Sequence, residues 1–195
     1  MNVVFLDRDG VVNQFPGHGS YVTKVRDFKF LPGSKKAIAQ LTRLGYKIFI
    51  ISNQAGVGRG LFSKEKLDQI DAFMHRKIRE AGGKITQSLY CPHHPDQGCD
   101  CRKPNLGNVK QALKSIGCTL AQAKGCFFVG DAWVDMELGR QAGLKTIFVK
   151  SGKSTEAQIR REGAKPDYVV ANLAGAVRII LHEDPRHPRH RRSGA

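Results

Sequence analysis

Short apolar runs alternate along this chain with longer segments in which apolar residues recur at a helical spacing. A strand that is followed by a helix and then by another strand needs a crossover connection, which joins parallel strands. The order therefore favours an α/β fold, a doubly wound parallel sheet with helices on both faces. The predicted strands are residues 3–6, 46–51, 85–90, 126–129, 146–149 and 168–170, and the predicted helices are residues 34–44, 63–81, 106–116, 133–141, 155–162 and 173–181.

Length and composition fit one domain. The chain has 195 residues, of which 41% are hydrophobic and 25% are charged, as in ordinary globular proteins. We expect a single domain over residues 1–181, followed by a basic, disordered tail over residues 182–195 that is rich in Pro, Arg and His. A monomer is the default expectation for the oligomeric state.

The apolar runs and the amino-terminal sequence predict a cytoplasmic protein with no membrane partner. No apolar run approaches the roughly 18 residues of a membrane span. Val3–Leu6 is followed at once by Asp7, Arg8 and Asp9, which leaves no room for the apolar region of a signal peptide.

The net charge is unusually positive. Lys and Arg number 32 against 17 Asp and Glu, which gives a net charge of +15. Such an excess attracts polyanions, a class that includes sugar phosphates, nucleotides and nucleic acids. A basic surface without a particular ligand is the alternative, because net charge bears on solubility and association rather than on a site.

Polar residues follow three of the predicted strands where those strands end. Asp7 and Asp9 follow the first strand, residues 52–54 follow the second, and Asp131 follows the fourth. In a doubly wound sheet these ends converge on one crevice. Because Asp7 and Asp9 are two positions apart, we expect both to point the same way, with Arg8 pointing aside. Their repulsion predicts a Mg2+ ion with Asp131 as a third ligand, although an isolated Asp-x-Asp is more often a loop or cap feature.

Residues 91–104 form a loop, which we call the metal loop or zinc loop, with the composition of a metal site. Three thiols and one imidazole lie within eleven residues, a set suited to tetrahedral Zn2+. The predicted ligands are Cys91, His93, Cys99 and Cys101, with His94 as the alternative imidazole. Prolines, a glycine and few apolar residues argue against simple burial of the thiols. Because four protein ligands leave no open position, we expect a structural zinc that fixes the loop.

Four short motifs occur in order along the chain. They are Phe5-Leu-Asp7-Arg-Asp9-Gly-Val, Ile51-Ser52-Asn53-Gln54, Cys101-Arg102-Lys103-Pro104 and Val129-Gly-Asp131-Ala-Trp-Val-Asp135. In order and spacing they resemble the four motifs of the haloacid dehalogenase-like (HAD-like) superfamily of phosphatases, over residues 1 to about 175. The resemblance implies a Rossmann-like sheet, bound Mg2+ and an aspartyl-phosphate intermediate.

The resemblance also implies a role for each acidic residue. Asp7 would be the nucleophile that becomes phosphorylated, and it would also bind Mg2+. Asp9 would protonate the leaving oxygen and then activate water, with its main-chain carbonyl facing the Mg2+ ion. Asp131 would be the further Mg2+ ligand.

The remaining motif residues would stabilise charge on the phosphoryl group. The resemblance implies that Ser52 donates a hydrogen bond to it and that Lys103 neutralises its charge while holding the nucleophile. Asp135 would act one step away, as a partner of Lys103 or of a metal-bound water.

Within the superfamily, a zinc loop that runs into Cys-Arg-Lys-Pro resembles two groups, the heptose bisphosphate phosphatases and the histidinol-phosphate phosphatases. Both lack a large cap domain, so residues 10–28 and the zinc loop would form the rim of the site. The six-residue step from His93 to Cys99 resembles the histidinol group. Residues 52–60 and 18–22 resemble the heptose group.

The basic rim favours a substrate with two phosphates. Arg59 and Arg102, with Lys24, can bind a second phosphate, whereas histidinol phosphate carries an ammonium and an imidazole. We therefore expect Mg2+-dependent removal of the 7-phosphate from a heptose 1,7-bisphosphate, a small phosphorylated sugar. The predicted substrate-binding residues are His18, Tyr21, Ser52, Asn53, Gln54, Arg59, Arg102 and Lys103.

Three other functions remain open from the sequence. A histidinol-phosphate phosphatase is the first. A phosphatase that processes nucleic-acid ends would use the basic charge, but aromatic residues make up only 8% of the chain and no stacking platform is evident. A zinc-binding interaction module without activity would leave Asp7, Lys103 and Asp131 unexplained together.

Overall fold

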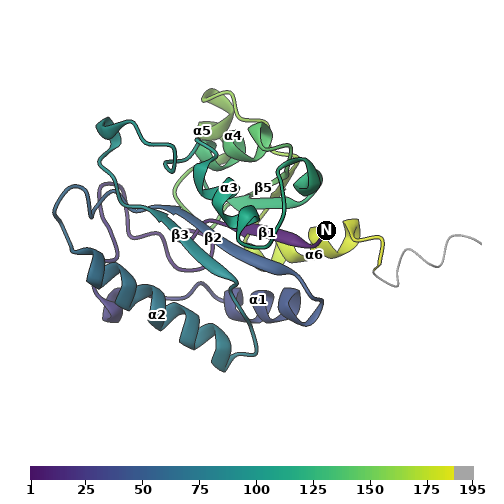
Figure 1. The fold of residues 1–195 in the computed structure, drawn as a ribbon, viewed down its shortest axis with the longest axis horizontal. Coiled ribbons are helices and arrows are strands. Elements are labelled where there is room, and N and C mark those ends of the chain that lie inside the picture. Colours follow the sequence, from purple (N-terminus) through teal and green to yellow (C-terminus); the bar gives the residue numbers. More distant parts are fainter. Residues whose placement is uncertain (187–195) are drawn as a thin grey trace, which may run out of the picture.

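The computed structural model, which describes residues 1–186, contains one sheet of six parallel strands (Figure 1). The strands are β1 (Val3–Leu6), β2 (Lys47–Asn53), β3 (Gln87–Cys91), β4 (Phe127–Gly130), β5 (Lys145–Val149) and β6 (Tyr168–Val170). Their order across the sheet is β3-β2-β1-β4-β5-β6. The predicted Rossmann-like α/β fold is confirmed.

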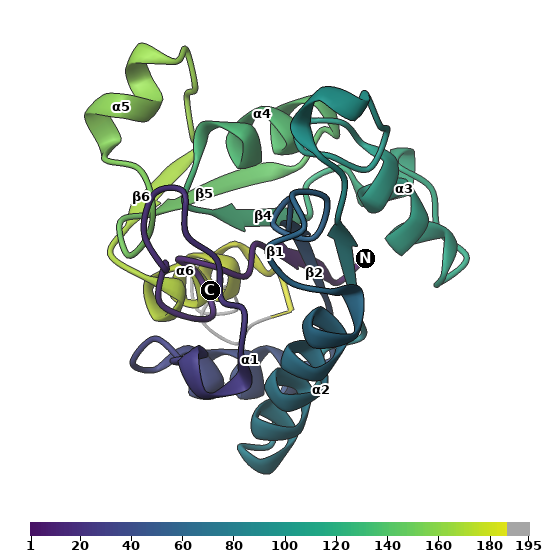
Figure 2. The same ribbon diagram turned by 90° about the vertical axis from the view of Figure 1, so that its left-hand side faces the viewer.

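Helices cover both faces of this sheet. The α-helices are α1 (Ser34–Arg43), α2 (Lys64–Glu80), α3 (Gly107–Lys114), α4 (Trp133–Gln141), α5 (Glu156–Arg161) and α6 (Leu173–Glu183). Figure 2 shows α1, α2 and α6 on one side of the sheet and α3, α4 and α5 on the other. Short 3-10 helices occur at η1 (Val25–Asp27), η2 (Pro95–Gln97) and η3 (Ala121–Ala123).

The core is divided by the sheet into two main apolar layers. Alternate residues of each central strand enter opposite layers, so Val4 packs with α1, α2 and α6, whereas Phe5 packs with α3 and α4. The Phe5 ring stacks on Phe49 of β2 and Phe128 of β4, with centroid distances of 5.7 and 6.2 Å. Both faces are buried, which explains why the central strands read as continuous apolar runs.

The chain changes direction across the sheet beside β1. It passes from β1 to β2 and β3 on one side and then returns to β4 on the other. Asp7 donates its main-chain N–H to the carbonyl of Val129 over 2.9 Å, which ties the end of β1 to β4. In open α/β sheets, ligands bind beyond the strand ends at such a switch point.

Several element boundaries differ from the predictions at positions that matter for the site. β2 extends to Asn53, so Ser52 and Asn53 belong to the strand, and β3 ends at Cys91 instead of before it. Residues 88–91 pair with residues 50–53 of β2. These pairings carry the first cysteine of the metal loop next to the polar end of β2.

The carboxyl-terminal tail does not begin at residue 182 as predicted. Helix α6 continues to Glu183, and the Tyr46 hydroxyl donates a 2.7 Å hydrogen bond to Asp184. Arg186 also pairs with Asp184 and lies over the Tyr46 ring, 5.5 Å from its centroid. The expected disorder of the remaining tail falls outside the described residues.

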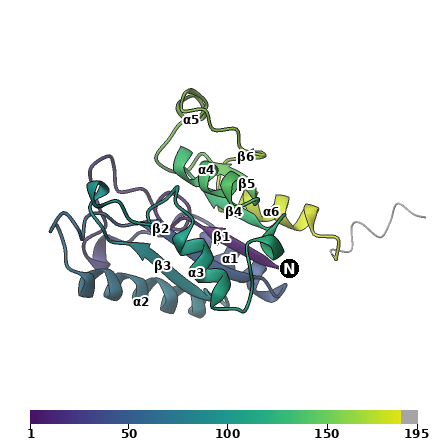
Figure 3. The same ribbon diagram turned by 45° about the horizontal axis from the view of Figure 1, so that its top comes forward.

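Helix α2 packs Ile70, Met74 and Ile78 into the apolar layer on one face of the sheet. In Figure 3, α2 runs along one side of the molecule and α5 stands above β6. Within residues 1–186, no helix combines the length and the apolar character needed to cross a membrane.

Candidate active site

A cavity of about 580 Å³ opens at the carboxyl ends of the strands. Its walls come from the segment after β1, the end of β2, the metal loop and the loops after β4 and β5. Most of the predicted site residues line this cavity. They are Asp7, Asp9, His18, Tyr21, Ser52, Asn53, Cys99, Arg102, Lys103 and Asp131.

Three carboxylates meet at the base of the cavity. Each of Asp7, Asp131 and Asp135 offers an oxygen, and these oxygens lie within 4.8 Å of one another. Glycines make the close packing possible, because a Cβ atom at Gly10 or Gly152 would overlap the Asp131 carboxylate. Gly10 also has a φ of +82°, which favours glycine in the turn after Asp9.

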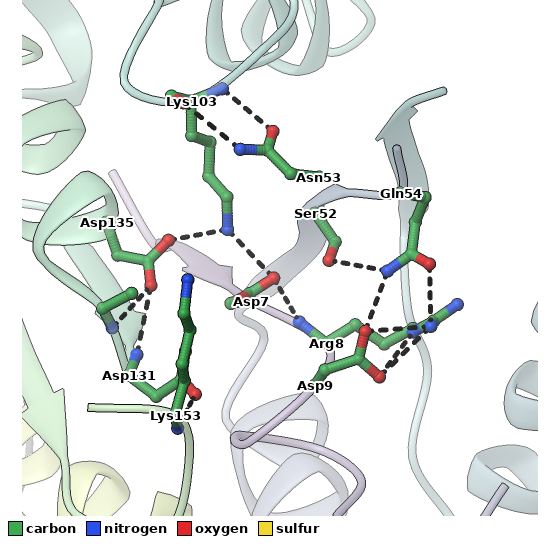
Figure 4. A network of polar contacts seen from close by, with 11 residues as sticks. Asp7, Arg8, Asp9, Ser52, Asn53, Gln54, Lys103, Asp131, Asp135 and Lys153 are labelled. Carbon is green, nitrogen blue, oxygen red and sulfur yellow. Dashed lines mark hydrogen bonds and ion pairs between the residues drawn. The ribbon is translucent and has the colours of Figure 1, made fainter. Parts of the chain in front are cut away.

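Lys103 supplies positive charge to this cluster. Its Nζ atom lies 2.9 Å from Asp7 Oδ1 and 2.6 Å from Asp135 Oδ1 (Figure 4). Asn53 holds the lysine backbone, since its Oδ1 accepts from the Lys103 N–H and its Nδ2 donates to the Lys103 carbonyl. Burial opposes the charged ammonium, but the carboxylates of Asp135 and Asp7 outweigh this effect and raise the pKa of Lys103.

Two main-chain N–H groups hold the Asp135 carboxylate in place. Its Oδ2 atom accepts from the main-chain N–H groups of Asp131 and Ala132 over 3.1 and 3.0 Å. This side chain is fully buried, and burial raises its pKa to about 6 despite the contact with Lys103. Its place beside Lys103 agrees with one of the two roles predicted for it.

The chemistry of this cluster suits a divalent hard cation. Burial and repulsion by Asp7 and Asp135 raise the pKa of Asp131 well above its ordinary range. Three carboxylates face one ammonium, so negative charge remains uncompensated at the cavity floor. Carboxylate oxygens are the ligands that Mg2+ prefers, and the residues present therefore fit this ion.

Asp9 does not point with Asp7, contrary to the prediction. Its carboxylate turns away from Asp131 and contacts Arg8 and Gln54 (Figure 4). Asn13 also donates a hydrogen bond to it. The alternation of side chains holds only within a strand, and β1 ends at Leu6 before both acidic residues. Burial would raise the pKa of Asp9, but Arg8 and these hydrogen bonds lower it.

Two further expectations differ from the structure. Arg8, predicted to point aside from Asp7 and Asp9, is completely buried and pairs with Asp9. Gln54, predicted to bind substrate, is also completely buried and does not line the cavity. Its side chain instead bridges Arg8, Asp9 and Ser52.

The rim of the cavity carries aromatic and cationic side chains. His18 packs edge-to-face on Phe15, and Tyr21 packs on Phe62. The Nη1 atom of Arg102, a residue that lines the cavity, is buried and has no hydrogen-bond partner among the described residues. Arg59 lies in an adjoining hollow of about 770 Å³ that shares Tyr21 with the main cavity.

Trp133 and Lys153 are among the cavity residues that were not predicted. Trp133 begins α4, and Lys153, an exposed residue, follows β5 (Figure 4). The main-chain N–H of Lys153 donates to Asp131 Oδ2. Its position after a strand was the available signal, since strand ends converge on the crevice.

The metal loop brings the four predicted soft ligands together. The Sγ atom of Cys99 lies 3.5 Å from that of Cys91 and 3.4 Å from that of Cys101, and His93 Nδ1 lies 3.1 Å from Cys101 Sγ. All four ligand atoms fall within 4.8 Å of one another. His94 stands outside this group and pairs with Asp96. Tetrahedral zinc is suited to three thiolates and an imidazole, so these residues fit that ion.

The metal loop is also tied to the end of β2. The main-chain N–H groups of Gln54 and Gly58 donate to the carbonyls of Cys91 and Pro92, both over 2.7 Å. A Cβ atom at Gly58 would overlap the backbone of the loop. The metal loop therefore helps to hold the segment that carries Arg59 in place.

Comparisons with known proteins agree with this geometry. Residues 100–176 match the HAD-hydrolase-like family model. The D-glycero-beta-D-manno-heptose-1,7-bisphosphate 7-phosphatase of Pseudomonas putida is 33% identical over 93% of this chain and 100% of that protein. The same enzyme of Haemophilus ducreyi is 37% identical over 91% of this chain and 97% of that protein.

A solved structure shares the whole fold. The D,D-heptose 1,7-bisphosphate phosphatase of B. bronchiseptica, complexed with magnesium and phosphate, superposes with a TM-score of 0.84. It is 34% identical, and the match covers 94% of this chain and 100% of that one. The chain therefore belongs to the D-glycero-D-manno-heptose 1,7-bisphosphate 7-phosphatase family of HAD-like hydrolases.

Proposed function

We propose that this protein is a Mg2+-dependent phosphatase that removes the 7-phosphate of D-glycero-D-manno-heptose 1,7-bisphosphate through an aspartyl-phosphate intermediate. The observation that carries the proposal is the Asp7 carboxylate, which faces the cavity in contact with Lys103 and beside Asp131. The names of the relatives support the choice of substrate.

Asp7 and Asp131, with the main-chain carbonyl of Asp9, would hold the Mg2+ ion. When bound, the ion neutralises charge on the phosphoryl oxygens and on the neighbouring carboxylates. Lys103 adds a fixed positive charge from the metal loop, and Ser52 lines the same wall of the cavity. Phosphoryl transfer depends mainly on such positioning and charge stabilisation.

The reaction proceeds in two displacements. A carboxylate oxygen of Asp7 forms a bond to phosphorus while the bond from phosphorus to the sugar oxygen breaks, and Asp9 gives its proton to that oxygen. Asp9 then takes a proton from water, whose oxygen attacks phosphorus and releases inorganic phosphate and free Asp7. Because Asp9 lies at the cavity wall, it can serve both steps from one side.

The rim supports a substrate with a second anionic group. Arg102 offers a buried nitrogen without a partner, and Lys153 and Arg59 add positive charge around the opening. His18 and Tyr21 complete the wall and would contact the sugar. A cationic rim is a poor host for the ammonium and imidazole of histidinol phosphate.

We further propose that Zn2+ occupies the Cys3His cluster as a structural ion. Its four ligands leave no position for substrate, and the loop that they hold leads directly to Arg102 and Lys103. None of the five cysteines, which all lie within residues 1–186, forms a disulfide, which suits a reducing compartment, and we therefore place the enzyme in the cytoplasm.

Initial rates with heptose 1,7-bisphosphate and histidinol phosphate, measured side by side with Mg2+, test the substrate. We expect the bisphosphate to be preferred, with loss of one phosphate per sugar and retention of the phosphate at C1. Preference for histidinol phosphate would overturn the assignment. In parallel, Asp7→Asn is expected to abolish turnover, and activity comparable to wild type would contradict its role as nucleophile.

A further inference from the structure

Arg8 is a charged side chain with no access to solvent. Its exposed fraction is 0%, although it lies between two residues that line the active-site cavity. Among the ion pairs of the described residues, its guanidinium pairs with Asp9 alone. A buried cation is costly unless a counter-ion and hydrogen bonds compensate for the lost hydration, so this arrangement calls for an explanation.

Three side-chain hydrogen bonds join Arg8 to Asp9. Arg8 Nη2 lies 3.1 and 3.0 Å from the two carboxylate oxygens of Asp9, and Arg8 Nε lies 3.3 Å from Oδ1. Such a fork fixes the plane of the carboxylate as well as its distance. Asn13 Nδ2 donates to Asp9 Oδ1 over 2.7 Å from the other side.

Gln54 fastens both members of this pair. Its Oε1 atom accepts from Arg8 Nη2 over 3.0 Å, and its Nε2 atom donates to Asp9 Oδ2 over 2.9 Å. One amide therefore links the guanidinium and the carboxylate. Because Gln54 is completely buried, its side chain has little freedom to release them.

The opposite side of the guanidinium packs on an aromatic ring. The Arg8 Cζ atom lies 5.6 Å from the centroid of Tyr90 in β3. The Tyr90 hydroxyl donates a 2.6 Å hydrogen bond to Asp71. The ring thus closes the space behind Arg8 and leaves the Asp9 side as its charged contact.

We propose that Arg8 is a positioning residue for Asp9, held in turn by Gln54, and that it acts on the reaction through the Asp9 carboxylate that it places and not through contact with substrate. The inference rests on the proposed function, in which Asp9 exchanges protons with the leaving oxygen and with water. Arg8 lies behind Asp9 and does not line the cavity, so it makes no contact with substrate.

If this placement is lost, the change in reaction rate should depend on the leaving group. A sugar alkoxide is a poor leaving group and needs a proton as the bond to phosphorus breaks. A nitrophenolate leaves without one. Misplacement of Asp9 should therefore slow phosphorylation of the enzyme by the sugar phosphate much more than phosphorylation by an aryl phosphate.

The test is a double-mutant cycle that combines Arg8→Met with Asp9→Asn in the full chain with Mg2+. Single-turnover rates of alcohol release are measured with heptose 1,7-bisphosphate and with 4-nitrophenyl phosphate. We expect Arg8→Met to slow the sugar phosphate roughly 100-fold, with little change in KM, and the aryl phosphate only a few-fold. In the Asp9→Asn background, Arg8→Met should cause no further loss.

Gln54→Leu is the second variant, and it decides the outcome if Arg8→Met fails to fold. It keeps the ion pair but removes the amide that links its two members, so a smaller effect with the same dependence on the leaving group is expected. Arg76→Met is the matched control. It makes the same substitution at an exposed arginine of α2 that lies over the Phe73 ring and pairs with Glu80, and it should behave like wild type.

Equal slowing of both esters, or losses that add in the cycle, would overturn the inference and leave Arg8 with a purely structural role. The proposed function fails in a different way. Wild-type enzyme that is phosphorylated on Asp7 by the aryl phosphate but does not act on the heptose bisphosphate would refute the substrate, and the cycle would then be measured with another sugar phosphate.

Discussion

The Nζ atom of Lys103 lies 2.9 Å from Asp7 Oδ1, although Asp7 follows the first strand and Lys103 ends the metal loop. This contact brings the positive charge of the metal loop next to the carboxylate that is the proposed nucleophile. The same ammonium contacts Asp135, which α4 and the end of β4 hold in place. The loop that carries the Cys3His cluster thus brings a positive charge to the carboxyl ends of the strands.

Replacement of Lys103 should remove most of the activity. Lys103→Met takes away the positive charge beside Asp7, and we expect kcat/KM to fall roughly 10²- to 10³-fold. Steady-state rates at saturating Mg2+ measure the effect. Lys110→Met, at an exposed lysine of α3, is the control and should retain wild-type rates. A loss smaller than about 10-fold in the Lys103 variant would contradict a direct role in charge stabilisation.

A methyl group at Gly152 should disturb the metal-binding carboxylates. Its Cβ atom would overlap the Asp131 side chain, so either the loop after β5 or the carboxylate must move. We expect Gly152→Ala to lower kcat/KM about 100-fold and to raise the Mg2+ concentration needed for half-maximal rate. Gly175→Ala is the comparison, since its nearest neighbour is a Val170 side-chain atom 3.0 Å away. Equal Mg2+ requirements in both variants would argue against the proposed site.

Cys99→Ser should release zinc and destabilise the metal loop. A missing thiolate breaks the four-ligand set, and a loss of ~3 kcal/mol in the free energy of unfolding would lower Tm by roughly 6–12 °C. Metal analysis gives the zinc content, and calorimetry gives Tm. Activity should fall as well, because Lys103 is reached through this loop.

Cys118→Ser provides the matched control for the zinc experiment. Cys118 is a free thiol outside the cluster, with a 3.5 Å contact to the carbonyl of Ile116. Zinc content and Tm should stay close to wild type. Full zinc content in Cys99→Ser would mean that the ligand set is different.

The positions of the strands along the chain, and of the carboxylates at their ends, could be predicted from the sequence for a simple physical reason. In a parallel sheet both faces are buried, so strands are visible as apolar runs and polar residues at their ends are conspicuous. Asp131 could therefore be placed near Asp7 without knowledge of the distance between them. The cysteine spacing predicted the Cys3His group because all four side chains lie in one short segment.

Side-chain directions just beyond a strand could not be predicted in this way. After Leu6 the backbone turns, and the main-chain carbonyl of Arg8 accepts from Val11, Val12 and Asn13. Alternation then no longer fixes which way Asp9 points. The burial of Arg8 depends on Gln54, which is distant in sequence and reaches it only through the pairing of strands.

The ion pair at the carboxyl-terminal end of the described chain predicts a pH-dependent stability. The hydrogen bond from Arg186 lowers the pKa of Asp184 well below its usual range, burial opposes this, and the Tyr46 hydroxyl adds to the lowering. A carboxyl with a lowered pKa stabilises the fold above its unfolded pKa of about 3.9, and this stabilisation is lost as pH falls through the folded value. Asp184→Asn should therefore lower the free energy of unfolding by about 1–2 kcal/mol at pH 7, with a smaller deficit at pH 3. Urea unfolding at both pH values measures the difference, with Asp27→Asn, in an exposed pair with Arg26, as a control that should change little. A deficit of the same size at pH 7 and pH 3 would show that the charge of Asp184 is not what stabilises this end of the chain.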